Sequence, residues 1–130
     1  MILVITPLYA AVLALMFLVL RTMVTVERAR SGISILTGNN TNLAVKSRRF
    51  GNFIETVPFA LILMGFAEME GTAPALVHGA GILLLVSRLL HPLGLHPEKG
   101  NHPLRILSGV LTMATFALGA AAILWQLLAA

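Results

Sequence analysis

Long apolar runs separated by shorter polar stretches dominate this sequence. Four such runs cover residues 2–20, 50–66, 73–90 and 104–128. A helix needs about 20 apolar residues to cross the roughly 30 Å hydrocarbon core of a bilayer, and each run is close to that length. The pattern therefore predicts four membrane-spanning helices, with connections over residues 21–49 and 91–103 on one side of the membrane and a short turn on the other.

The basic residues gather on one side of this predicted topology. All nine lie in or beside the two longer connections, whereas the turn between the second and third runs holds Glu68 and Glu70 and no basic residue. Because loops rich in Lys and Arg stay in the cytoplasm, we expect both connections to be cytoplasmic and both termini to face outward. The basic residues are Arg21, Arg28, Arg30, Lys46, Arg48, Arg49, Arg88, Lys99 and Arg105.

Composition agrees with a membrane protein and excludes several other classes. Hydrophobic residues make up 58% of the 130 positions and charged residues only 11%, too few to cover a water-soluble surface. No cysteine is present, which excludes disulfides, thiolate metal sites and a cysteine nucleophile. The net charge of +4 comes from basic residues in or beside the two longer connections, and these residues form no basic stripe. We therefore expect no nucleic-acid partner. The predicted fold class is an all-α integral membrane protein, a single four-helix bundle over residues 1–130.

A row of polar residues enters the second apolar run from its cytoplasmic end. Arg48, Asn52 and Glu55 have the spacing that places them on one face of a helix, and Pro58 follows within a turn. A carboxylate inside a bilayer costs about 2.5–3.5 kcal/mol on insertion scales unless it is paired or faces water. The row therefore indicates a built polar site.

The residues alone leave two interpretations of this row open. In the structural one, Arg48 is an interfacial anchor. Glu55 then pairs with Arg88 or Arg105 from a neighbouring helix and locks the bundle. In the functional one, the same side chains form a positively charged pocket for an anionic ligand.

Histidines accompany the basic residues near the third run. Arg88 and His91 share a helix face at its cytoplasmic end. His91, His96 and His102 are five and six residues apart with prolines between them, a spacing that matches no zinc signature. We therefore expect no metal site.

The fourth run carries small and hydroxyl-bearing residues at helical spacing. Such a stripe lets two membrane helices approach closely, so it predicts a packing seam against another helix. The residues are Ser108, Thr112, Thr115, Gly119 and Ala122.

As a set, these motifs resemble the MAPEG family, the membrane-associated proteins in eicosanoid and glutathione metabolism. The resemblance rests on the pattern Arg48-x-x-x-Asn52-x-x-Glu55-x-x-Pro58 in the second of four helices. It extends to Arg88-x-x-His91 at the end of the third helix, Arg105 at the start of the fourth and the acidic outer turn. The small bacterial members are the most similar.

The resemblance implies a function and its site residues. It implies a homotrimer in a bacterial inner membrane that binds glutathione as cosubstrate between subunits near the cytoplasmic face. Arg48, Asn52 and Glu55 would hold the tripeptide, and Arg88 and His91 would support the pocket. Arg105, the catalytic candidate, would lie near the thiol and favour the thiolate. The expected activity is glutathione transferase or peroxidase chemistry on a lipophilic electrophile or hydroperoxide, within membrane lipids.

One departure from the family pattern leaves two alternative functions open. Eukaryotic members carry tyrosines near the end of the third helix, whereas residues 89–95 contain none and the only tyrosine is Tyr9. A catalytically inert scaffold of the same family is one alternative. The other is a small multidrug-type transporter that exchanges protons on Glu55.

Overall fold

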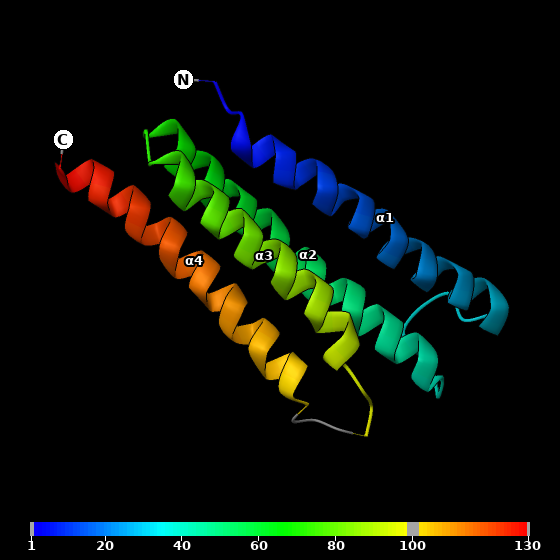
Figure 1. Ribbon diagram of the computed structural model, residues 1–130. Helices are drawn as coiled ribbons and strands as arrows, with labels where there is room; N and C mark the ends of the chain where they lie inside the picture. Colours follow the sequence, from blue (N-terminus) through cyan, green and yellow to red (C-terminus); the bar gives the residue numbers. More distant parts are fainter. Residues whose placement is uncertain (1, 99–101, 130) are drawn as a thin grey trace.

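The computed structural model describes residues 2–98 and 102–129, which form four helices in an up-and-down arrangement (Figure 1). All four are long and apolar enough to cross a membrane, and the described residues contain no strand. The predicted all-α, four-helix membrane fold is therefore confirmed, whereas the outward orientation of the termini stays a prediction. Lys99, one of the predicted cytoplasmic basic residues, lies outside the described residues. The helices are α1 (Ile5–Ser31), α2 (Thr41–Met69), α3 (Pro74–Gly94) and α4 (Pro103–Ala129).

The helices form a row with α2 and α3 in the middle. α1 packs on α2 and, less extensively, on α3, while α4 packs mainly on α3 and also on α2. Within the described residues α1 and α4 do not contact each other, and both chain ends lie at the same end of the bundle (Figure 1). The opposite end, where α3 passes into α4, carries the predicted polar residues.

The first two helices are longer than the predicted spans, and the connection over residues 21–49 is mostly helical. Only residues 32–40 lie between α1 and α2. Gly32 ends α1 with a left-handed φ of 67°, and the side chain of Asn40 caps α2 by accepting a 2.9 Å hydrogen bond from the Leu43 N–H. A 2.6 Å ion pair between Glu27 and Lys46 joins the two extensions.

At the other end, a carboxylate from α2 caps α1. Glu68 accepts backbone N–H bonds from Val4, Ile5 and Thr6 at 2.7, 2.7 and 2.8 Å. These N–H groups have no partner within a helix, and a negative charge there also complements the helix dipole. Glu68, predicted as part of an acidic outer turn, thus fixes where α1 begins.

Close backbone approaches set the spacing of the central helices. A Cβ on Gly94, at the end of α3, would lie 2.4 Å from the backbone nitrogen of Arg105 in α4. A Cβ on Gly119 would lie 3.1 Å from Leu63 of α2. The stripe predicted on α4 is buried at Ser108, Thr112, Thr115 and Gly119. It is a packing seam within the subunit.

Candidate functional site

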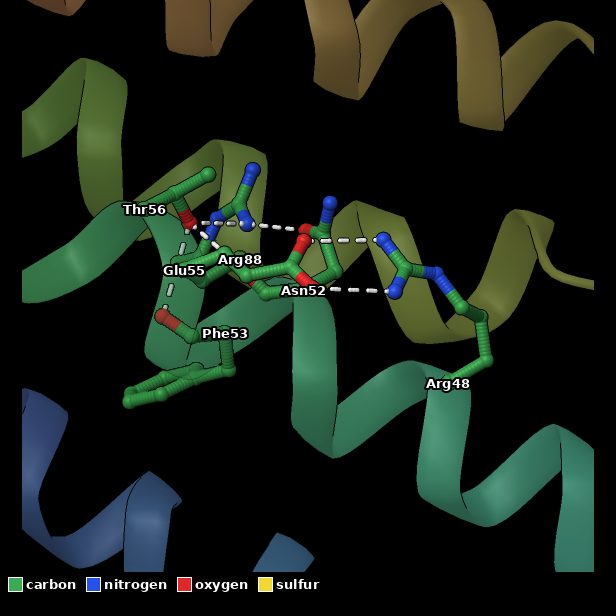
Figure 2. Close-up of polar contacts among 6 residues, drawn as sticks. All are labelled: Arg48, Asn52, Phe53, Glu55, Thr56 and Arg88. Carbon is green, nitrogen blue, oxygen red and sulfur yellow. Dashed lines mark hydrogen bonds and ion pairs between the residues drawn. The ribbon is translucent and has the colours of Figure 1, made fainter.

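The guanidinium of Arg88 is the most buried charge at the polar end of the bundle. Arg88 lies in the penultimate turn of α3, and only 2% of it is exposed. It donates hydrogen bonds to Asn52 and Thr56 of α2 (2.8 Å to Thr56), to its neighbour Ser87 (3.1 Å) and to Thr112 of α4. Figure 2 shows its contacts with the α2 side chains. One residue thereby ties three helices together.

Two threonines are oriented to accept from this guanidinium. The Thr56 hydroxyl donates its own hydrogen to the Asn52 carbonyl at 2.7 Å, and the Thr112 hydroxyl donates to the Ser108 carbonyl at 2.7 Å. With each hydrogen committed to its own helix backbone, a lone pair of each oxygen remains for Arg88. The hydrogen bonds within each helix therefore orient the two hydroxyl oxygens so that they can accept from Arg88.

All of the hydrogen-bond partners of Arg88 within the described residues are uncharged. An arginine carries five N–H donors, and four are used by Asn52, Thr56, Ser87 and Thr112. One N–H on Nη2 is left without an acceptor in the described part of the chain. A buried charge is costly unless it is both hydrogen-bonded and balanced, and here only the first condition is met. The arrangement favours an anion as the missing partner.

Glu55 forms its ion pair with Arg48, and not with Arg88 or Arg105 as the structural interpretation of the polar row expected. Arg48 donates two parallel hydrogen bonds to its carboxylate, Nη1 to Oε1 at 3.0 Å and Nη2 to Oε2 at 2.9 Å (Figure 2). The side chains are 55% and 54% exposed, respectively. The expected pairing of Glu55 with Arg88 or Arg105 is therefore wrong within this subunit. Both of those are on other helices, whereas Arg48 shares the same face of α2.

A cavity of about 200 Å³ lies between α2, α3 and α4 at this end of the bundle. Five of the six predicted site residues line it, and Glu55, the sixth, is held beside it by Arg48. Of the predicted site residues that line it, Arg88 and His91 are buried, while Arg48 and Arg105 are exposed. The lining residues are Arg48, Asn52, Thr56, Arg88, His91, Leu95, Arg105, Ser108, Gly109, Thr112 and Met113.

Three polar residues that line this cavity were not predicted as site residues from the sequence. Thr56 follows Asn52 by one helical turn, a spacing that could have revealed it. Ser108 and Thr112 were interpreted only as packing residues, yet they also line the cavity, and Thr112 binds Arg88. Arg49, which the sequence placed only among the basic residues, does not line the cavity. It donates a 3.1 Å hydrogen bond to the Leu95 carbonyl and so joins α2 to the end of α3.

The site is rich in nitrogen donors and contains few carboxylates. Within residues 2–98 and 102–129, no group of three or more His, Asp or Glu side chains is arranged to hold a metal ion. The cavity instead presents the guanidinium groups of Arg48, Arg88 and Arg105, together with the amide of Asn52 and the ring of His91. Such a set suits a small anion with several carboxylate or similar groups.

Comparison with known proteins gives one family. The model of the MAPEG family matches residues 6–125. The inner membrane protein YecN of Escherichia coli strain K12 is 35% identical over 92 residues, which cover 71% of this chain and 70% of that protein. YecN of Escherichia coli O6:H1 matches with the same identity and coverage. No solved structure matches the chain.

Proposed function

This chain belongs to the MAPEG family, and from that premise we propose that it is a glutathione transferase or peroxidase of the inner membrane. Glutathione would bind in the cavity at the polar end of the bundle. The observation that carries the proposal is Arg88: a buried guanidinium with only uncharged hydrogen-bond partners in the described residues, beside an open cavity.

Charge complementarity supports glutathione as the ligand. The tripeptide has two carboxylates and one ammonium group, so it is a net anion, and ionisation of its thiol adds a further negative charge. Guanidinium groups bind carboxylates through two parallel hydrogen bonds. Arg48 and Arg105 at the exposed edge of the cavity would engage the carboxylates, and Arg88 would supply positive charge from within. Glu55 would be placed to receive the ammonium group.

The size of the cavity supports a site shared between subunits. Small-molecule sites usually occupy about 300–1,000 Å³, whereas this cavity has about 200 Å³. Arg48 and Glu55 are more than half exposed beside it. A neighbouring copy covering this face would enlarge and close the site, as in the homotrimer that the family resemblance implies. The concentration of arginines at this end supports a cytoplasmic location.

The proposed chemistry needs little from the protein beyond charge and position. A cation near the thiol stabilises the thiolate, which is the nucleophilic form, and Arg105 is the residue we assign to this task. The thiolate sulfur would form a bond to an electrophilic carbon, and the leaving group would depart with its electron pair. With a hydroperoxide, two glutathione molecules would give the disulfide, an alcohol and water.

The test is binding of glutathione to protein reconstituted in nanodiscs. Calorimetry would measure affinity, and ultraviolet absorbance would report the bound thiolate. We expect saturable binding with a thiolate signal in the wild type. Arg48→Ala should weaken binding, and Arg105→Ala should reduce the thiolate signal at saturation. Arg30→Ala is the matched control, because Arg30 is an exposed arginine that does not line the cavity.

Two results would contradict this proposal. Binding without any thiolate signal, and without turnover of an aryl halide or a lipid hydroperoxide, would favour the inert scaffold. Equal affinities in wild type, Arg48→Ala and Arg30→Ala would mean that the cavity is not the glutathione site.

A further inference from the structure

Arg49 directly follows Arg48 in α2 but faces a different part of the bundle. Successive side chains of a helix are turned by roughly 100°, and Arg48 lines the cavity of the candidate site whereas Arg49 does not. The Nη2 of Arg49 instead donates a 3.1 Å hydrogen bond to the Leu95 carbonyl. Its Nε is buried and has no acceptor in the described residues. An arginine that only anchors a bundle at the membrane interface keeps its guanidinium in water, so the buried Nε indicates a role inside the protein.

The carbonyl that Arg49 binds is at the end of α3. Leu95 follows the last helical residue, Gly94, and has extended backbone angles (φ −92°, ψ 99°). The last carbonyls of a helix have no partner within it, and the helix dipole places partial negative charge at this end. A guanidinium satisfies the acceptor and complements the charge. Arg49 therefore holds the end of α3 against α2.

Gly94 places the end of α3 in direct contact with the first turn of α4. A Cβ at Gly94 would lie 2.4 Å from the backbone nitrogen of Arg105 and 2.8 Å from the carbonyl carbon of Leu104. The two backbones therefore touch with no side chain between them. Close-packed interiors transmit strain, and this contact has no flexible side chain to absorb a shift. The place where α3 ends thus sets the position of Arg105.

Leu95 and Arg105 both line the cavity of the candidate site. Leu95 is only 9% exposed, so a shift of the end of α3 would change the wall of the cavity. A shift of Arg105 would change the distance between its guanidinium and a bound thiol. The attraction between charges falls with distance, and a displacement of about 1 Å can strongly reduce a reaction rate. A contact outside the cavity can therefore affect the chemistry inside it.

We propose that Arg49 is a positioning residue for Arg105. By capping α3 through the Leu95 carbonyl, Arg49 holds the first turn of α4, and with it the guanidinium of Arg105, at the cavity. Arg49 itself does not touch the ligand. The consequence for glutathione rests on the proposed function, whereas the consequence for the contact between α3 and α4 does not.

The proposal is tested with two measurements on each variant in nanodiscs. Amide hydrogen exchange reports how firmly the first turn of α4 is held, since the N–H groups of Arg105 and Ile106 both bond to the His102 carbonyl. Ultraviolet absorbance at saturating glutathione reports the bound thiolate. Arg49→Met removes the cap and the charge, and Arg49→Lys keeps the charge without the planar fork. Arg30→Met is the matched control, because Arg30 is exposed and outside the cavity.

We expect Arg49→Met to speed exchange of the Arg105 and Ile106 amides about tenfold, because it removes a hydrogen bond from a charged donor. The thiolate signal at saturation should fall in the same variant. Arg49→Lys should show smaller losses of both properties, in the same proportion. Arg30→Met should match the wild type in both measurements.

Three results would overturn the proposal. Wild-type exchange in Arg49→Met would mean that the cap does not hold α4. Faster exchange in Arg49→Met with a wild-type thiolate signal would mean that the held contact does not position Arg105 for the thiol. Faster exchange in Arg49→Lys with a full thiolate signal would mean that Arg49 acts only through its charge. If the wild type binds no glutathione, the proposed function fails, and the exchange measurement still decides whether Arg49 holds α4.

Discussion

Arg48 and Glu55 face each other across two turns of α2 and share two parallel hydrogen bonds of 3.0 and 2.9 Å. More than half of each side chain is exposed, so the pair lies at the edge of the cavity rather than inside it. Where water reaches this edge of the cavity, an ion pair contributes little to stability because solvent screens it. The pair is therefore better suited to exchanging partners with a ligand than to holding the bundle together.

Arg48→Ala and Glu55→Gln should each leave the thermal stability nearly unchanged, whereas Arg48→Ala should weaken glutathione binding about tenfold or more through loss of a bidentate carboxylate contact. Calorimetry and thermal unfolding would measure the two effects. Normal glutathione binding in both variants, together with proton-coupled cation uptake that Glu55→Gln abolishes, would support the transporter alternative instead.

Arg88→Lys should reduce both stability and binding. A lysine keeps the positive charge but lacks the planar fork that reaches Asn52, Thr56 and Thr112 together. Loss of hydrogen bonds to a charged group predicts a destabilisation of about 1.5–3 kcal/mol, measured by denaturation in detergent. Arg30→Lys is the control and should have no effect. Wild-type stability in Arg88→Lys would mean that the three-helix contact is not important for folding.

Ionic strength should affect glutathione binding in a defined direction. Arg48 and Arg105 are exposed, so salt screens their attraction for an anion, with a screening length that falls from about 10 Å at 0.1 M to about 3 Å at 1 M. The dissociation constant should rise with added NaCl. The slope should be shallower in Arg48→Ala and unchanged in Arg30→Ala. A dissociation constant that does not vary with salt would exclude recognition by these exposed arginines.

Glu68→Ala should loosen the start of α1. The substitution leaves the N–H groups of Val4, Ile5 and Thr6 without their carboxylate acceptor. Loss of an N-terminal cap typically costs about 0.5–2 kcal/mol. We expect a lower unfolding temperature and faster amide exchange confined to the first turn of α1. Glu70→Ala, an exposed carboxylate in the same connection, is the control. Equal effects of the two substitutions would rule out a specific capping role.

Two glycines of α3 predict opposite outcomes for the same substitution. At Gly79 a Cβ meets nothing within 4 Å, so Gly79→Ala should stabilise the helix by about 0.5–1 kcal/mol. At Gly94 the Cβ would meet the Arg105 backbone at 2.4 Å, so Gly94→Ala should destabilise the protein and displace Arg105. Thermal unfolding and glutathione affinity would be measured for both variants. A neutral Gly94→Ala would show that α4 can shift without affecting the site.

Hydropathy predicted the number and approximate positions of the helices because each span needs a long apolar run. Hydropathy alone does not place the end of α1 at Ser31 or the start of α2 at Thr41, since those segments are more polar, although residues 21–30 can be expected to extend the first helix beyond the membrane. Their helical structure is supported by the Glu27–Lys46 ion pair and by the Asn40 cap. Only the folded structure shows that Glu27 pairs with Lys46 and that Asn40 caps α2.

The candidate site could be predicted only in part, because spacing along the sequence shows which residues share a face of one helix but not how the helices pack. Helical spacing grouped Arg48 with Asn52 and Glu55, and it grouped Arg88 with His91. It could not establish that Arg88 reaches across to α2 and α4, because that depends on how the helices pack. Thr112 was missed because hydroxyl-bearing residues in a small-residue stripe have the same pattern whether they only pack or also accept hydrogen bonds.

The absence of contact between α1 and α4 in the described residues gives the bundle two unlike edges. If copies meet α1 edge against α4 edge, every contact is of the heterologous type, and each copy is rotated relative to the last by the same amount. Such an assembly either closes into a ring or grows without limit. Contact between like edges would instead give a two-fold dimer whose remaining edges stay open. An odd-numbered closed assembly therefore requires the unlike edges to meet, so substitutions on α1 and α4 should affect the same interface.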